Sequence, residues 1–103
     1  MTEYIYVSLQ DDDKIVSMSF DQNTGELSRL SEVSAVGGPS ALTASPNGDV
    51  IYSSLRNTNE IAIYKVDSTT GNLSVTGKLS VGESHTYLCI DRRGKFLLAA
   101  YYQ

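Results

Sequence analysis

Tryptophan is absent from this chain of 103 residues, and cysteine occurs once, at Cys89. A single cysteine excludes an internal disulfide, so thiol chemistry gives no support for secretion. No apolar run approaches the roughly 20 residues that a helix needs to span a membrane. The first residues also lack the basic start of a signal peptide. We therefore expect a cytoplasmic protein with no membrane partner.

Basic residues are few as well. Eight Lys and Arg stand against twelve Asp and Glu, which gives a net charge of −4. Phosphate binding needs clustered basic side chains, so we expect no nucleic-acid partner. Helical spacing of apolar residues is also lacking. Tyr, Val, Ile, Thr and Ser dominate the apolar runs, and these residues suit β-strands.

The sequence does contain an internal repeat of 46 residues. When residues 4–57 are aligned with residues 50–103 without a gap, 13 of the 54 pairs are identical. The identities cluster at apolar strand positions and at turn glycines, such as Gly25 with Gly71 and Gly48 with Gly94. Internal repeats of this length are typical of arrays built from one small structural unit.

Each repeat unit is predicted to contain four short strands separated by polar turns. The expected strands are residues 4–9, 14–20, 27–33 and 41–45 in the first unit, and 50–55, 60–66, 73–79 and 87–91 in the second. A ninth strand is expected at 96–102, with no helix longer than about one turn. The shared Asp-x-x-Thr-Gly-x-Leu sequence predicts that Gly25 and Gly71 occupy equivalent turns.

Four strands in a unit of roughly 40–50 residues are typical of a propeller blade. We therefore predict an all-β fold: a β-propeller fragment of about two four-stranded antiparallel blades plus the start of a third. The partial domain covers residues 1–103, with repeat 1 at about 4–49, repeat 2 at about 50–95 and the start of repeat 3 at about 96–103. A self-contained antiparallel sandwich of nine strands is the alternative.

Several motifs, in this order and spacing, resemble the lactonase family of seven-bladed β-propellers. They are residues 4–8, the two Asp-x-x-Thr-Gly-x-Leu turns at 21–27 and 67–73, and residues 45–48, 51–56 and 87–102. Because they correspond to the start of the family's sequence, we expect Met1 to be a genuine start and the missing part to lie at the C-terminal end.

The resemblance implies a function as well as a fold. It implies a lactone hydrolase that converts 6-phosphogluconolactone to 6-phosphogluconate in the pentose phosphate pathway, with a sugar-acid lactone as partner and with neither metal nor cofactor. It places the catalytic pocket at the central axis, built by several blades, so we expect the 103 residues alone to be inactive. Alternatives are a muconate-lactone cyclase relative, a non-catalytic binding or scaffold module, and a truncated product with no activity.

Three side chains are weak candidates for the catalytic site. Arg56 matches a family arginine at a strand end and could clamp a phosphate or carboxylate. Tyr87 lies where relatives carry His or Tyr, and it could face the axial channel or pack as a core aromatic. His85 is the only histidine, but it lies two positions from that family position, so we expect a solvated loop histidine.

Two further features are interpreted as structural. The acidic run 11–13 lacks the glycine and distal glutamate of a calcium loop, which favours a solvated turn. Cys89 lies in an apolar strand and is expected to be a small buried side chain. Open blade edges, above all the uncharged segment 96–102, predict that the isolated chain self-associates or is unstable.

Overall fold

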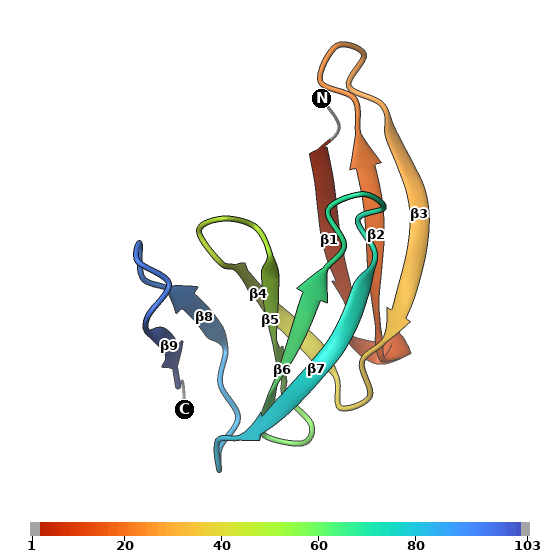
Figure 1. Cartoon of the computed structure of the whole chain (residues 1–103). Helices are drawn as coiled ribbons and strands as arrows, with labels where there is room; N and C mark the ends of the chain where they lie inside the picture. Colours follow the sequence, from red (N-terminus) through yellow and green to blue (C-terminus); the bar gives the residue numbers. More distant parts are fainter. Residues whose placement is uncertain (1–2, 102–103) are drawn as a thin grey trace.

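The computed structural model describes residues 3–101, which form nine strands and one short 3-10 helix (Figure 1). The elements are β1 (Glu3–Leu9), η1 (Gln10–Asp12), β2 (Lys14–Phe20), β3 (Leu27–Ser34), β4 (Pro39–Ala44), β5 (Val50–Leu55), β6 (Glu60–Val66), β7 (Leu73–Ser80), β8 (Tyr87–Ile90) and β9 (Leu97–Ala100). The all-β fold is thereby confirmed. Within residues 3–101, no helix is long and apolar enough to cross a membrane.

The strand boundaries agree closely with those predicted. β2, β5 and β6 have the predicted bounds, and β4 begins at Pro39, two residues earlier than expected. β9 ends at Ala100. Tyr102, the predicted end of that strand, lies outside the described residues. The turn residues of the sequence therefore set the strand ends to within about two residues, because they interrupt the strand pairing.

The strands form three antiparallel sheets that follow one another along the chain. Sheet 1 has the order β1-β2-β3, sheet 2 the order β4-β5-β6-β7, and sheet 3 the order β8-β9. Figure 1 shows the three sheets side by side in chain order, with sheet 2 in the middle. Consecutive strands pair within each sheet, as in a series of propeller blades.

The boundary between sheets 1 and 2 lies one strand before the boundary between the two sequence units. β4, at the end of the first unit, pairs with β5 of the second. The two strands meet in a tight turn, where the Ser45 amide donates to the Val50 carbonyl at 2.8 Å and the Gly48 amide donates to the Ser45 carbonyl at 2.9 Å. The loop 35–38 instead carries the chain from sheet 1 to sheet 2. The fourth strand of each sequence unit therefore opens the next sheet.

The two Asp-x-x-Thr-Gly-x-Leu turns have the same conformation, which confirms the prediction for Gly25 and Gly71. Their φ angles are +75° and +77°. The amide of each glycine donates to the carbonyl of the turn aspartate at 2.7 Å, from Gly25 to Asp21 and from Gly71 to Asp67. Each aspartate Oδ1 also accepts two amides of its turn at 2.8 and 3.3 Å. The aspartate organises the turn, and the glycine takes the left-handed conformation.

A β-bulge recurs at one place in both repeats. The register between β2 and β3 shifts at Ser17/Met18, and that between β6 and β7 shifts at Ile63/Tyr64, 46 residues later. A bulge bends its strand and increases the local twist. The repeat therefore preserves a backbone irregularity that the residue pattern alone did not predict.

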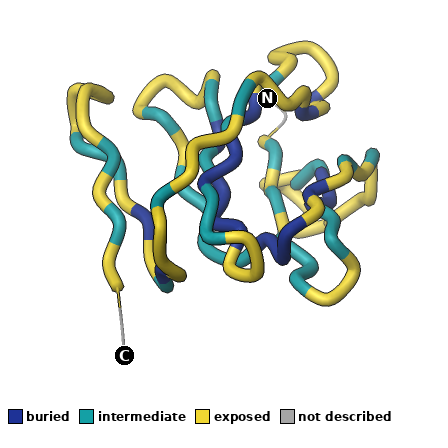
Figure 2. The backbone as a smooth tube through the Cα atoms, turned by 90° about the horizontal axis from the view of Figure 1, so that it is seen from below, coloured by how far each residue is buried: buried dark blue, intermediate teal, exposed yellow. Residues whose placement is uncertain are grey.

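The apolar core lies between sheets 1 and 2, in an interface that we call the seam. Its buried members are Ile15, Ala35, Ile51, Leu55, Ala62, Tyr64 and Leu73. Figure 2 shows the buried backbone concentrated in the middle of the molecule. Each square ångström of apolar surface removed from water contributes about 25 cal/mol. Packing of sheets 1 and 2 against one another therefore stabilises both.

Candidate active site

One end of the molecule gathers the candidate residues. Antiparallel strands alternate direction, so the segments 10–13, 35–38, 56–59 and 81–86 all lie at this end, which we call the loop end (Figure 1). The amides of Arg56 and Asn57 donate to the carbonyls of Gly38 and Gly37, at 3.0 and 2.8 Å. The loop between sheets 1 and 2 is thereby attached to the turn that carries Arg56.

The glycines of this loop permit that attachment. Gly37 and Gly38 have φ angles of +124° and +78°. A Cβ at Gly37 would lie 2.6 Å from the Thr58 hydroxyl oxygen, and one at Gly38 would lie 2.6 Å from the Asn57 side-chain nitrogen. A larger residue would be strained by these φ angles, and its Cβ would require the exposed Thr58 and Asn57 side chains to move. The backbone on either side of Arg56 is therefore held by a loop whose conformation favours glycine.

Asp13 holds the same loop from sheet 1. Its Oδ1 accepts the amides of Gly37 and Gly38 at 3.3 and 3.0 Å, and its carbonyl accepts the Ala35 amide at 2.7 Å. The acidic run was expected to be a solvated turn. Asp11 and Asp12 are exposed, but Asp13 instead forms hydrogen bonds to the connecting loop. The adjacent glycines Gly37 and Gly38 could have indicated this role in the sequence, because their backbone amides need hydrogen-bond acceptors.

Arg56 follows β5 directly, and its side chain is exposed at the loop end. Its charge also affects a neighbour from another segment, because Arg56 lowers the pKa of His85. The structure therefore brings these two predicted residues, 29 positions apart in sequence, within electrostatic reach of each other. An exposed guanidinium on a fixed backbone can bind a carboxylate or phosphate in a bidentate manner.

His85 is fully buried, so the expectation of a solvated loop histidine is wrong. The reason lies in the repeat, which aligns His85 with Pro39, another fully buried residue. Each of the two lies where the chain enters a new sheet. The His85 ring meets the Tyr101 ring edge-on, with centroids 6.1 Å apart at an angle of 63°. Within residues 3–101, neither ring nitrogen has a hydrogen-bond partner.

The environment of His85 favours the neutral imidazole. Burial lowers its pKa the most, the nearby backbone of Glu83 opposes this effect, and the positive charge of Arg56 lowers the pKa further. A neutral imidazole can accept a proton, which is the requirement for a general base. Its burial separates it from solvent, so any such role depends on a substrate reaching the loop end.

Tyr87 and Cys89 lie on a different surface. The side chains of β8 alternate: Leu88 is buried, while Tyr87 and Cys89 are exposed. The expectation that Cys89 is buried is therefore wrong, because β8 packs only its other face. Tyr87 lies two positions after His85, yet one side chain is buried and the other is exposed. The structure thus brings Arg56 near His85 and leaves Tyr87 on an open face.

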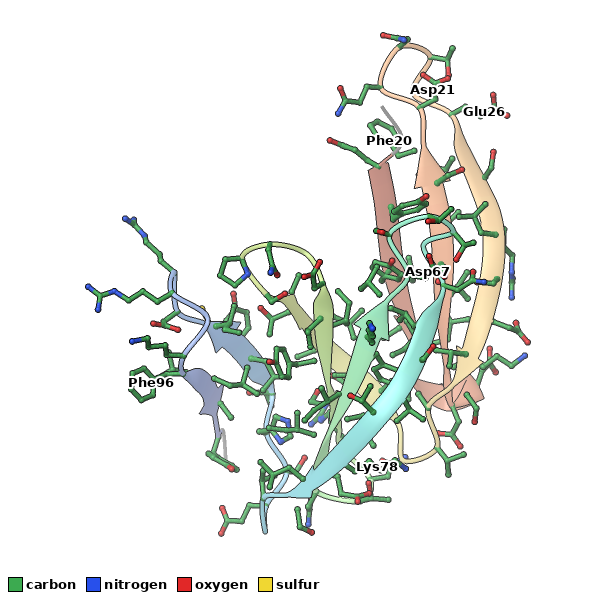
Figure 3. The ribbon with its side chains drawn as sticks, viewed as in Figure 1. Phe20, Asp21, Glu26, Asp67, Lys78 and Phe96 are labelled. Atoms are coloured by element: carbon green, nitrogen blue, oxygen red, sulfur yellow. The ribbon has the colours of Figure 1, made fainter. Side chains whose placement is uncertain are left out.

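Two surface hollows lie at the opposite end, beside the Asp-x-x-Thr-Gly-x-Leu turns. The first, of about 420 Å³, is lined by Ser19, Phe20, Asp21, Gln22, Asn23, Glu26 and Ser28, three of which are labelled in Figure 3. The second, of about 370 Å³, is lined by Lys65, Val66, Asp67, Ser68 and Ser74. They occupy the same place in sheets 1 and 2. Among the described residues, no group of three His, Cys, Asp or Glu could hold a metal ion.

Comparison with known sequences supports the resemblance. Residues 3–103 match the family described as "Lactonase, 7-bladed beta-propeller". The 6-phosphogluconolactonase of Formosa agariphila is 38% identical over 90 residues, which cover 81% of this chain and 26% of that protein. The 6-phosphogluconolactonase of Yersinia pestis is 30% identical over 102 residues, which cover 99% of this chain and 30% of that protein. The chain thus spans less than a third of these relatives.

Solved structures share the arrangement of the sheets. A proposed 6-phosphogluconolactonase from Bacteroides uniformis superposes with a TM-score of 0.84 at 29% identity, covering 93% of this chain and 29% of that one. A protein of unknown function from Desulfotomaculum acetoxidans superposes with a TM-score of 0.86 at 16% identity, covering 95% of this chain and 31% of that one. The second similarity supports the fold alone.

Proposed function

The chain belongs to the lactonase family of seven-bladed β-propellers, and on that premise we propose that it forms part of an enzyme that hydrolyses 6-phosphogluconolactone. The three sheets then correspond to neighbouring blades. The family match over residues 3–103 carries the proposal, and two relatives named 6-phosphogluconolactonase support it. The product, 6-phosphogluconate, would place the protein in carbohydrate metabolism, at the pentose phosphate pathway in the cytoplasm.

The reaction sets the requirements for the site. Water adds to the lactone carbonyl, the ring C–O bond breaks, and the products are a carboxylate, a hydroxyl group and a released proton. The enzyme must accept a proton from water and stabilise the oxyanion that forms on the carbonyl. The substrate also carries a phosphate, which an arginine can bind through two parallel hydrogen bonds.

Arg56 is the best candidate to bind the phosphate. Its guanidinium is exposed, and its backbone is held by the Gly38 carbonyl. His85 would remain neutral at pH 7, because burial lowers its pKa. A neutral His85 would place no second positive charge near the arginine. Tyr87 is a candidate hydrogen-bond donor for a part of the pocket that other blades build.

A chimera tests the proposal directly. The aligned segment of the Formosa agariphila relative is replaced by the corresponding residues of this chain, and hydrolysis of 6-phosphogluconolactone is followed above the spontaneous rate. We expect an active chimera, and we expect Arg56→Ala to raise KM by about ten- to a hundredfold, as loss of a charged hydrogen bond predicts. Lys65→Ala, at the opposite end, serves as the matched control. A folded but inactive chimera would contradict the proposal.

The chain alone is expected to leave the spontaneous rate of lactone hydrolysis unchanged. It spans less than a third of its relatives, and a pocket shared by several blades needs all of them. The assay uses purified chain whose β-sheet content has been verified by circular dichroism. Hydrolysis well above the spontaneous rate would show that residues of these three sheets suffice for catalysis.

A further inference from the structure

The loop between sheets 1 and 2 is hydrogen-bonded on both sides through its two glycines. The amides of Gly37 and Gly38 donate to a single oxygen of Asp13, Oδ1, at 3.3 and 3.0 Å. The Gly37 carbonyl accepts the Asn57 amide at 2.8 Å, and the Gly38 carbonyl accepts the Arg56 amide at 3.0 Å. Each glycine therefore uses its amide toward sheet 1 and its carbonyl toward sheet 2. We call these hydrogen bonds the glycine bridge.

The next repeat shows which part of this arrangement recurs. Asn59 lies 46 residues after Asp13, and both residues have a left-handed backbone, with φ angles of +57° and +52°. Each carbonyl accepts the first amide of the following loop, Ala35 for Asp13 at 2.7 Å and Val81 for Asn59 at 2.9 Å. Within residues 3–101, only the Asp13 side chain also bonds to its loop, and positions 83–84 of the other loop are not glycines. The backbone bond thus belongs to the repeat, and the glycine bridge is an addition to it.

The glycine bridge ends at the turn that carries Arg56. One repeat earlier, the position of Arg56 is occupied by the uncharged Gln10. The Arg56 side chain is exposed, and an arginine loses rotational freedom when it binds a ligand. A fixed backbone beneath the guanidinium reduces this cost, because fewer positions of the group remain to be lost on binding. The added hydrogen bonds therefore reach the group for which a fixed position has a functional consequence.

We propose that Asp13 is a positioning residue for phosphate binding, which fixes the backbone of Arg56 through the glycine bridge and so the place where the guanidinium meets the phosphate. This inference rests on the proposed function, in which Arg56 binds the phosphate of 6-phosphogluconolactone. Asp13 acts only through Arg56. Its contribution is an acceptor oxygen rather than a charge, because both glycine amides bond to Oδ1 alone.

Kinetics of the chimera with the Formosa agariphila relative test this role. Asp13→Gly removes the acceptor, and glycine suits the left-handed backbone at this position. We expect KM for 6-phosphogluconolactone to rise about three- to tenfold at unchanged kcat, as loss of hydrogen bonds that support a binding group predicts. Asp13→Ala also lacks the oxygen and should behave alike. Asp12→Gly makes the same change at an exposed neighbour and leaves KM unchanged.

The conservative variant separates the acceptor from the charge. Asp13→Asn keeps Oδ1, removes the negative charge and introduces the residue type that Asn59 has at the equivalent position. We expect it to retain the wild-type KM. A KM as high as that of Asp13→Gly would show that the charge acts on the phosphate site, and it would overturn the role of the glycine bridge.

A double-mutant cycle distinguishes positioning of Arg56 from a general loss of stability. If Asp13 acts through Arg56, Asp13→Gly raises KM no further once Arg56→Ala has been made. A merely structural role would lower kcat or the active fraction, and its effect would add to that of Arg56→Ala. Circular dichroism and urea unfolding establish that each variant is folded.

The outcomes separate the role of Asp13 from the proposed function. A folded but inactive chimera contradicts the proposed function, and the role of Asp13 falls with it. An active chimera in which Asp13→Gly leaves KM unchanged overturns the role of Asp13 alone. The same holds if Asp13→Gly raises KM equally with and without the Arg56 side chain.

Discussion

At the scale of single residues, the place of His85 in the repeat determines its burial more strongly than its residue type does. Histidine is usually partly exposed, yet His85 is fully buried because it occupies the place that Pro39 has one repeat earlier. Both residues fill the point where the chain passes from one sheet to the next. The small apolar ring of Pro39 fits there without needing a hydrogen-bond partner. The imidazole fits the space but leaves two polar atoms unpartnered among residues 3–101.

His85 should make stability depend on pH between about 7 and 5. Burial holds its folded-state pKa below the ordinary value of 6.5, so the unfolded chain binds more protons in this range. The free energy of unfolding therefore falls as the pH drops below about 6.5. Glu32 and Asp91 also have lowered pKa values, but they titrate below 4.5 and 3.8 and so outside this range.

Urea unfolding of wild type and His85→Phe at pH 5 to 8 measures this effect. The variant keeps an aromatic ring in the site and removes the only histidine, so the decline between pH 7 and 5 should disappear. At pH 7 it should be no less stable than wild type, because two unpartnered buried nitrogens are removed. Equal slopes in the two proteins would mean that His85 is accessible to water in solution.

At the scale of elements, the two glycine turns share a conformation but differ in surroundings. Alanine at either position would have to adopt a left-handed backbone, which costs about 1–2 kcal/mol. At Gly71 the new methyl group would also displace the Tyr4 ring, whereas at Gly25 it would meet nothing. We expect Gly71→Ala to destabilise the chain by about 1–3 kcal/mol more than Gly25→Ala, as overpacking does elsewhere.

Thermal unfolding of the two variants at low protein concentration measures that difference. The pair is matched in residue type, φ angle and the amide hydrogen bond to the turn aspartate, so the contacts with Tyr4 and Tyr6 separate the two substitutions. If both variants lose the same stability, the Tyr4 ring moves aside without cost, and the seam is looser than the structure indicates.

The elements themselves could be predicted from sequence because their signals are local. Turn glycines and alternating apolar residues fixed the bounds of β2, β5 and β6. The pairing of β4 with β5 was harder to predict, because a repeated pattern does not show where one structural unit ends and the next begins. The fourth strand of each unit could equally be the first strand of the next sheet. The burial of His85 and the hydrogen bonds that Asp13 accepts depend on contacts between segments far apart in sequence, so reading each segment by itself did not predict them.

At the scale of the whole molecule, the seam couples sheets 1 and 2 into one structure. Sheet 1 contributes Ile15 and the Tyr6 ring to the apolar cluster, and sheet 2 contributes Leu55 and Tyr64. The Tyr64 hydroxyl also donates to the Ser34 carbonyl at 3.4 Å, which is one of several hydrogen bonds across this interface. The two sheets should therefore unfold together, and a substitution that weakens the seam should lower the stability of both sheets equally.

Tyr6→Phe tests this coupling. It removes the 2.7 Å hydrogen bond to Gly71 and leaves that carbonyl unpaired, which should lower the free energy of unfolding by about 1–2 kcal/mol. Because the sheets unfold as a unit, amide hydrogen exchange should accelerate by the same factor in β2 and β6. Tyr52→Phe, one repeat later and outside the seam cluster, is the matched control and should have little effect. Faster exchange confined to β2 would mean that sheet 1 opens alone, and that the seam holds two independent units in contact.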